Sequence, residues 1–166
     1  MDIRPATADD AEAIISLWHR GWHEAHAALV PEEILAYRKP DTFRTWWAEA
    51  TDRFFVAVSG ARPISFVSVK DCEVVKLYVG SAARGTGVAP ALLAFAERTL
   101  AQVGVTEAEL FCTAGNARAE RFYLRNGWRL AETFDDALWT PAGVTRRVIV
   151  PTHRFRKGLA GQFSAR

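Results

Sequence analysis

The sequence is short of several features that would place it in a special class of protein. It has only two cysteines, Cys72 and Cys112, in 166 residues, so we expect reduced thiols in a cytoplasmic protein rather than a disulfide framework. No apolar run approaches the roughly 20 residues that span a bilayer. The N-terminal stretch MDIRPATADD lacks the apolar region of a signal peptide. Basic residues exceed acidic ones by only two, 21 against 19. We therefore expect neither a membrane nor a nucleic-acid partner.

What is present is the composition of an ordinary globular domain, with 49% apolar and 24% charged residues. The patterns predict an α/β fold with a mixed sheet, formed by a single domain over residues 1–152 and followed by a basic, frayed tail over 153–166. Strands are expected at 2–6, 53–59, 63–69, 73–79, 107–114, 128–134 and 145–151. Helices are expected from Thr7 to about His26, and at 30–38, 40–51, 87–103 and 116–127.

A glycine loop, VGSAARGTGVAPALL over residues 79–93, joins the strand at 73–79 to the next helix. Unpaired N–H groups at a helix N-terminus suit a phosphate, and glycine lets them approach it closely. The nucleotide-triphosphate loop GxxxxGK[ST] is excluded because no lysine lies in 77–106. The dinucleotide motif GxGxxG is excluded because Pro90 stands where its third glycine belongs.

The loop fits a third pattern, (Gln/Arg)-x-x-Gly-x-(Gly/Ala), through Arg84, Gly87 and Ala89. A second motif, NARAERFYLRNGW, follows after one intervening strand. The two motifs in this order resemble the GNAT superfamily of acetyl-CoA-dependent N-acetyltransferases, over residues 2–151. The resemblance implies a mostly antiparallel sheet with helices on both faces. It also implies a splayed parallel pair, here 73–79 and 107–114, with the pantetheine arm of CoA between its strands.

Site residues are implied by the same resemblance. Main-chain groups of Leu77 and Val79 would meet the pantetheine amides, and Asn116 would bind the same arm. The pyrophosphate would lie among the backbone amides of Arg84, Gly85, Thr86, Gly87, Val88 and Ala89. Tyr123 would sit beside the CoA sulfur and protonate the departing thiolate. Phe122 would be core or a wall against the cofactor.

The general base is less well defined. An alkylamine is protonated at neutral pH and must lose a proton before it attacks. Glu73 shares strand parity with Leu77 and Val79, so it could face the cleft, although a solvated carboxylate is an equally good interpretation. Asp71, Glu24 and Glu33 are further candidates, and a water chain would need none of them.

The acceptor site is expected near WHRGWHEAHAAL (18–29), where His19, His23 and His26 share one helical face. We expect Trp22, His23 and His26 to contact the acceptor, with a solvated helix face as the alternative. No metal site is expected, because HEAH is not HExxH and no fourth ligand stands out.

The sequence therefore predicts an N-acetyltransferase that moves an acetyl group from acetyl-CoA to a primary amine, of a small molecule, by direct transfer. Two alternatives remain open: an enzyme that acetylates protein N-termini or lysines, and a CoA-binding module without catalysis. The acceptor is not identified. The oligomeric state also stays open, with a homodimer among the options.

Overall fold

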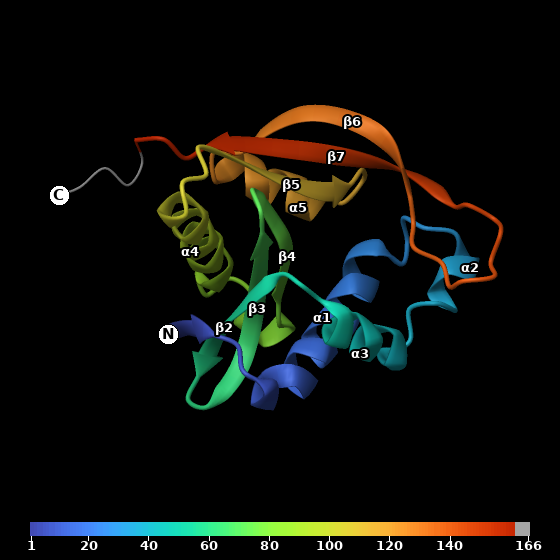
Figure 1. The fold of residues 1–166 in the computed structure, drawn as a ribbon, viewed down its shortest axis with the longest axis horizontal. Helices are drawn as coiled ribbons and strands as arrows, with labels where there is room; N and C mark the ends of the chain where they lie inside the picture. Colours follow the sequence, from blue (N-terminus) through green and yellow to red (C-terminus); the bar gives the residue numbers. More distant parts are fainter. Residues whose placement is uncertain (162–166) are drawn as a thin grey trace.

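The structure is a computed structural model, and it describes residues 1–161. These residues contain a seven-stranded sheet in the order β1-β2-β3-β4-β5-β7-β6 (Figure 1). Its strands are β1 (Asp2–Pro5), β2 (Arg53–Ser59), β3 (Arg62–Lys70), β4 (Glu73–Val79), β5 (Glu107–Thr113), β6 (Arg129–Ala137) and β7 (Ile149–Gly158). Every neighbouring pair is antiparallel except β4 and β5, which are parallel. The predicted α/β fold with a mixed sheet is confirmed.

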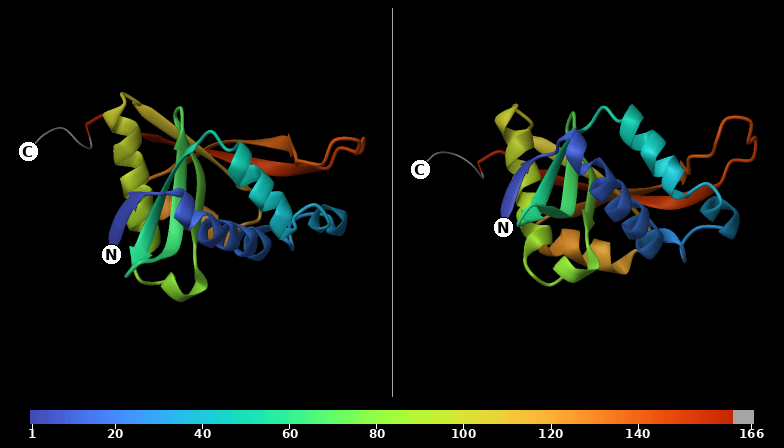
Figure 2. Two further views of the ribbon diagram at one scale, coloured as in Figure 1. Left: turned by 60° about the horizontal axis from the view of Figure 1, so that its bottom comes forward. Right: turned by 90° about the horizontal axis from the view of Figure 1, so that it is seen from below.

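Helices cover both faces of the sheet, as predicted. They are α1 (Ala11–His26), α2 (Glu32–Leu35), α3 (Pro40–Glu49), α4 (Val88–Gln102) and α5 (Ala117–Arg125), with short 3₁₀ turns η1 (Ala8–Asp10) and η2 (Ser81–Ala83). Figure 2 shows α4 and α1 on opposite sides of the green strands β3 and β4. The alternation of side chains along the strands therefore divides the core into two layers.

Each layer buries one set of helix side chains. On one face, Leu92 and Leu93 of α4 pack with Val67 of β3 and with Trp128. On the other face, α1 buries Ile14, Ile15, Trp18 and Trp22 against Phe43 of α3 and Phe66 of β3. This burial follows from the helical spacing of the apolar residues in the sequence.

The helices before β2 differ from the prediction. The helix expected at 30–38 is only one turn, α2, whereas α3 begins at Pro40 as predicted, with Lys39 as its cap. Lys39 has φ −89° and ψ 161°. A residue before proline avoids helical angles, so the chain straightens there and the preceding helix cannot continue. Proline itself is tolerated at the first helical position because its missing N–H would have no partner.

The prediction of a frayed tail from residue 153 is wrong for residues 153–158, which belong to β7. This strand lies between β5 and β6 and pairs with both along its length. Lys157 anchors it: its Nζ lies 3.0 Å from both carboxylate oxygens of Glu97 on α4 and donates to the Asn126 carbonyl at 2.7 Å. The basic composition that suggested a solvated end instead supplies ion pairs within the sheet. Residues 162–166 of the predicted tail lie outside the described residues.

Candidate active site

The strands β4 and β5 diverge from one another. Over residues 1–161 their register contains the single pair Glu73↔Glu109, whereas β4 pairs along β3 and β5 pairs along β7. Beyond that pair, the main-chain edge of each strand that faces the other is left without a strand partner. Such an edge binds an extended ligand through main-chain hydrogen bonds. The predicted parallel, splayed pair is confirmed.

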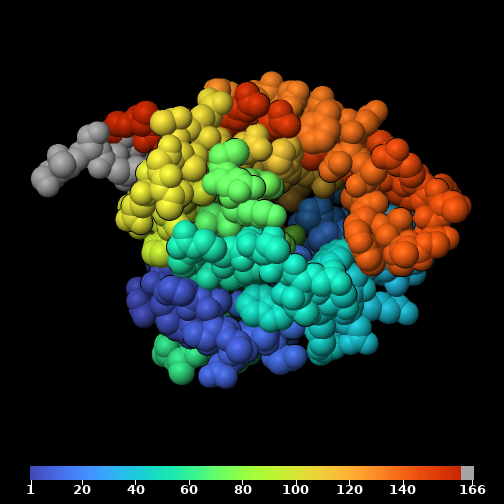
Figure 3. All heavy atoms as spheres, viewed as in Figure 1, coloured from blue at the N-terminus to red at the C-terminus, as the bar shows by residue number. Residues whose placement is uncertain are grey.

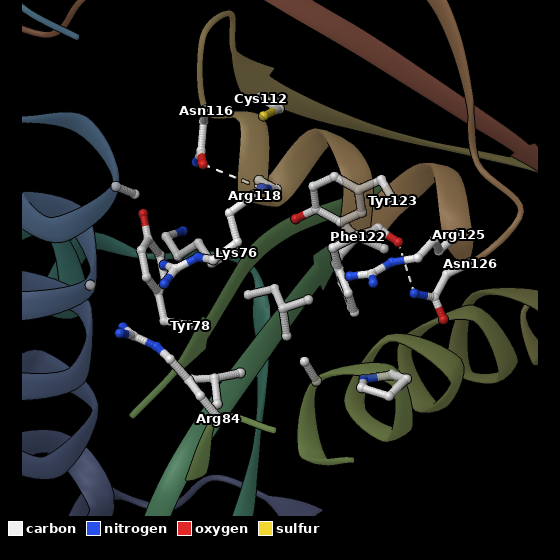
Figure 4. A pocket seen from close by; sticks show the side chains of 18 of the residues that line it. Lys76, Tyr78, Arg84, Cys112, Asn116, Arg118, Phe122, Tyr123, Arg125 and Asn126 are labelled. Carbon is white, nitrogen blue, oxygen red and sulfur yellow. Dashed lines mark hydrogen bonds between the residues drawn. The ribbon is translucent and has the colours of Figure 1, made fainter. Parts of the chain in front are cut away.

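A cavity of about 630 Å³ lies between β4 and β5 where the two strands diverge. Its walls come from β4, the glycine loop, the start of α4, β5, α5 and one side of α1. Among the residues predicted from the sequence, the lining includes Leu77, Val79, Arg84, Gly85, Gly87, Ala89, Asn116, Phe122, Tyr123 and His26. Figure 4 shows the side chains of α5 on one side of this space and Tyr78 and Arg84 on the other. The structure therefore brings the two sequence motifs together around one cavity.

The glycine loop presents backbone donors to the cavity. Gly85 and Gly87 have φ of +75° and +83°, left-handed angles that favour glycine. The amides of Arg84 and Thr86 donate to the Ser81 and Ala83 carbonyls at 3.3 and 3.4 Å. Within residues 1–161, the amides of Gly85, Gly87, Val88 and Ala89 have no hydrogen-bond partner. Four of the six predicted amides are therefore unpaired at the N-terminus of α4, where the helix dipole favours an anion.

The side chains of the loop divide into two groups. Val88 is buried in the core and Thr86 is hydrogen-bonded to the Ala83 carbonyl, so neither side chain lines the cavity. Arg84 does line it, and its guanidinium pairs with Glu24 of α1. Two of the further candidates for the general base are therefore in ion pairs: Glu24 with Arg84, and Glu33 with Arg146 at 3.0 Å.

Helix α5 places Asn116 and Tyr123 on the cavity side. Asn116 caps the helix, since its Oδ1 accepts from the Ala119 N–H at 3.3 Å. Tyr123, two turns later, packs its ring against Phe155 and Phe122, and its hydroxyl points away from α5 into the cavity (Figure 4). Burial raises the pKa of Tyr123 above its ordinary value. The hydroxyl is therefore protonated at neutral pH and can donate a proton.

Both cysteines are poor nucleophiles. Cys112 lines the cavity, and burial raises its pKa to about 12. Cys72 is half-buried, and burial also raises its pKa. The thiolate is the reactive form of cysteine, so neither residue suits an acyl-enzyme intermediate.

A β-bulge in β4 changes the predicted orientation of Glu73. Ser68 pairs with Lys76 and Val69 pairs with Val74, which leaves Val75 as an extra residue. One extra residue shifts the alternation of faces. Val74 therefore shares the α4 face with Leu77 and Val79.

Glu73 consequently lies on the α1 face, together with Lys76. The parity argument that placed Glu73 on the same face as Leu77 and Val79 is wrong, and Glu73 is not among the residues that line the cavity. Burial raises its pKa, the charge of Glu109 raises it further, and the charge of Lys76 opposes this shift.

Tyr78 is a cavity residue that sequence reasoning missed. It follows Leu77 on β4 and packs its ring against Gly21 of α1, where a Cβ atom would lie only 2.4 Å from Tyr78 Cδ1. A glycine within an otherwise amphipathic helix was the available signal, because such a position often marks a close approach. Arg118 and Arg125 of α5 also line the cavity, and their spacing of seven residues on one helical face could have identified them.

The three residues expected to contact the acceptor do not all line the cavity. His26 lines the cavity, with its Nδ1 2.9 Å from the Trp22 carbonyl oxygen. Trp22 of α1 is buried in the core, and the Nε2 of His23 lies 2.7 Å from the Arg38 carbonyl oxygen. Neither lines the cavity. No group of three or more histidine, cysteine, aspartate or glutamate residues within 1–161 could hold a metal ion.

A second, smaller hollow of about 300 Å³ adjoins the first at Lys76. It is lined by Trp18, Trp46, Glu49, Ala50, Asp52 and Lys76. The Lys76 Nζ lies 2.7 Å from Asp52 Oδ2 and 4.8 Å from the centre of the Trp18 ring. In Figure 3 the surface beside the turquoise atoms of α3 is hollowed, and atoms of the blue N-terminal part of the chain lie at its bottom. Lys76, next to the bulge, is thus shared by the two hollows.

Comparison with known proteins identifies the family. The sequence model of the acetyltransferase (GNAT) family matches residues 11–128. The chain belongs to the GNAT acetyltransferase family. Its members are acyltransferases, and the expectation of acetyl-CoA as cosubstrate agrees with this membership. The sequence matches no curated protein significantly.

Solved GNAT structures share the fold over nearly the whole chain. The apo form of YjaB from Escherichia coli has a TM-score of 0.70 at 20% identity, covering 93% of this chain and 95% of its own. The PaiA N-acetyltransferase of Thermoplasma acidophilum, solved with coenzyme A, has a TM-score of 0.67 at 18% identity, with 95% and 98% coverage. YncA of Salmonella typhimurium, solved with acetyl-CoA, has a TM-score of 0.68 at 17% identity, with 96% and 94% coverage. No helix within residues 1–161 is long and apolar enough to cross a membrane.

Proposed function

We propose that this GNAT protein transfers the acetyl group of acetyl-CoA to a primary amine of a small molecule, by direct attack in a ternary complex. The single observation that carries the proposal is the cavity between the splayed strands β4 and β5, with unpaired loop amides at one end and Tyr123 within it. An extended arm fits beside the free edge of β4, and a pyrophosphate fits at the N-terminus of α4. Two of the similar structures hold CoA or acetyl-CoA.

In the reaction, the amine nitrogen bonds to the thioester carbonyl carbon and the carbon–sulfur bond breaks. Tyr123 gives its hydroxyl proton to the departing thiolate. Its raised pKa means that the hydroxyl carries this proton at neutral pH. The buried, protonated Cys112 favours direct transfer over a route through an acyl-cysteine.

The acceptor enters through the second hollow, which meets the cavity at Lys76. Trp18 and Trp46 wall this hollow, and its volume of about 300 Å³ suits a small molecule better than a polypeptide segment. Trp22 and His23 line neither hollow, and His26 contributes to the cavity wall.

Glu73 accepts the proton that the ammonium group loses, through water. It lies on the α1 face of β4, and its pKa responds to the charges of Lys76 and Asp52, which line the second hollow. A carboxylate with a raised pKa is a stronger base than a solvent-exposed one and suits this role. We further propose that the enzyme works in the cytoplasm, where free thiols such as Cys72 and Cys112 stay reduced.

The test is transfer to a panel of small amines and short peptides, with CoA release followed by a thiol reagent. Replacing Tyr123 by phenylalanine keeps the ring packing and removes the hydroxyl. We expect kcat to fall by about 10²–10⁴-fold, with little change in acetyl-CoA affinity. Tyr37→Phe, which removes the hydroxyl of a tyrosine that does not line the cavity, serves as the matched control.

Three results would count against the proposal. An undiminished kcat of Tyr123→Phe, with chemistry rate-limiting, would remove the role of Tyr123. Activity on peptides alone would favour the protein-acetylating alternative. Tight acetyl-CoA binding without turnover on any amine would favour a CoA-binding module.

A further inference from the structure

Arg38 is a buried arginine in the short connection between α2 and α3. Its side chain is enclosed by three tryptophan rings from different parts of the chain. The guanidinium carbon lies 5.0 Å from the ring centre of Trp22 on α1, 5.2 Å from Trp46 on α3 and 5.7 Å from Trp139, which follows β6. Only 3% of the residue is exposed. Burial lowers its pKa to about 10, so the side chain is still a cation at neutral pH.

Among the buried charged residues that the structure describes, Arg38 differs from the others in having no counter-ion there. Buried Asp10 is paired with Arg4 at 2.7 Å, and buried Glu97 is paired with Lys157 at 3.0 Å. No carboxylate within residues 1–161 pairs with Arg38. A buried cation without an anion is strongly disfavoured, so this arrangement needs an explanation.

The guanidinium also has an unused hydrogen-bonding edge. Nη1 donates to the carbonyl oxygen of Trp139 at 3.0 Å and reaches that of Tyr37 at 3.5 Å. Nε is buried and has no hydrogen-bond partner within residues 1–161. Nη2 makes no hydrogen bond to any residue of the described chain. The edge formed by Nε and Nη2 is the one that can hold both oxygens of a carboxylate.

Arg38 lies near residues of both hollows of the active site, although it lines neither of them. Its charge acts on Tyr78 and His26, both of which line the cavity between β4 and β5. Trp46, which stacks on its guanidinium, lines the second hollow. The charge of this cation therefore reaches residues of both hollows.

We propose that Arg38 binds an anionic group of the acceptor, so that the acceptor is an amine that also carries a carboxylate, as a free amino acid does. This inference rests on the proposed function and specifies its substrate class. The Nε–Nη2 edge takes the carboxylate, while the amine points toward the thioester beside Lys76. Because Nε is out of contact with solvent, one of the flanking rings must move first. Trp139, which is 46% exposed and lies outside the strands, has the room to do so.

The experiment measures binding as well as turnover, using the twenty amino acids and their carboxamides as probes. The tryptophan rings around Arg38 report binding through their fluorescence when the enzyme is saturated with CoA. For at least one side chain we expect the acid to bind about tenfold or more tightly than its amide. The same preference is expected in kcat/KM when acetyl-CoA is present.

Two variants distinguish a binding role from a structural one. Arg38→Met should abolish the preference for the acid over the amide. Arg44→Met removes an exposed arginine of α3 that pairs with Asp41 and Glu12, and should keep the preference. Arg38→Lys retains the charge without the two-pronged edge, and should keep only part of it.

Three binding results would overturn the inference: amides that bind as tightly as acids to the wild type, a preference that survives in Arg38→Met, or the absence of binding by every acid tested. The first and third are decided with the wild type alone, even if Arg38→Met fails to fold. The proposed function fails separately, through the absence of transfer to any amine in the panel. Transfer only to amines without a carboxylate would overturn the role of Arg38 and leave the proposed function intact.

Discussion

Replacing Gly21 by alanine should destabilise this protein, although the same change at an ordinary helix position stabilises. Gly21 lies within α1, and a Cβ atom there would be 2.4 Å from Cδ1, 3.2 Å from Cε1 and 3.3 Å from Cγ of Tyr78. The clash falls on one edge of a ring that is packed between α1 and Phe66, whose ring centre is 5.6 Å away. The tyrosine ring has to move, and with it the cavity wall that it forms.

The magnitude is the difference between two opposing effects. Alanine in place of glycine in a helix stabilises by about 1 kcal/mol, because glycine loses more backbone entropy on folding. Overfilling a packed site typically destabilises by about 1–3 kcal/mol. The net effect of Gly21→Ala should therefore lie between roughly zero and 2 kcal/mol of destabilisation.

A double-mutant cycle separates the two effects. In a Tyr78→Ala background the ring is gone, so Gly21→Ala should stabilise by about 1 kcal/mol. The coupling free energy between the two positions should be about 1–3 kcal/mol, measured by urea unfolding followed by far-UV circular dichroism. If Gly21→Ala stabilised both backgrounds equally, the close contact between α1 and the Tyr78 ring would be refuted.

Three further predictions test other parts of the structure. Lys157→Met leaves Glu97 buried without its cation and should lower the free energy of unfolding by about 3 kcal/mol in urea titrations; a loss below about 1 kcal/mol would contradict the anchoring of β7. Asp10 has a pKa lowered to about 2, first by its hydrogen bonds with Arg4. Ionised Asp10 should therefore contribute roughly 2 kcal/mol to the free energy of unfolding above about pH 4, and this contribution should be lost as the pH falls through about 2. Asp10→Asn should remove this pH dependence of stability, and a variant with the same dependence as the wild type would contradict the prediction. Glu73→Gln should lower kcat and remove the fall in kcat/KM as the pH drops through the raised pKa of Glu73; an unaltered pH–rate profile would exclude Glu73 as the base.

Much of the fold could be predicted because its signals are local. The strands at 53–59 and 73–79 have the predicted bounds, since β-branched and aromatic runs end at clear turns. Asn116 at the start of α5 and the glycine loop before α4 were also identifiable, because capping and left-handed angles restrict the residue type.

The remaining features depend on contacts distant in sequence. The bulge at Val75 arises from pairing with β3 and reverses the face of Glu73, which strand parity alone cannot reveal. The composition of residues 153–158 predicts a solvated basic end, but in the structure their charges pair with carboxylates of β5, β6 and α4. Arg38 gives no sequence signal at all, because the three rings around it come from three separate elements.

Calorimetric titration with acetyl-CoA tests the central claim, that the cosubstrate binds in the opening between β4 and β5 with its pyrophosphate at the glycine loop. Gly87→Asp places a carboxylate where the phosphates should lie. Gly60→Asp, in the turn between β2 and β3, is the matched control, because it also has a positive φ and open space around its Cβ position. We expect wild type and Gly60→Asp to bind acetyl-CoA equally, and folded Gly87→Asp to bind it at least about a hundredfold more weakly. Equal affinity in all three proteins would contradict the assignment.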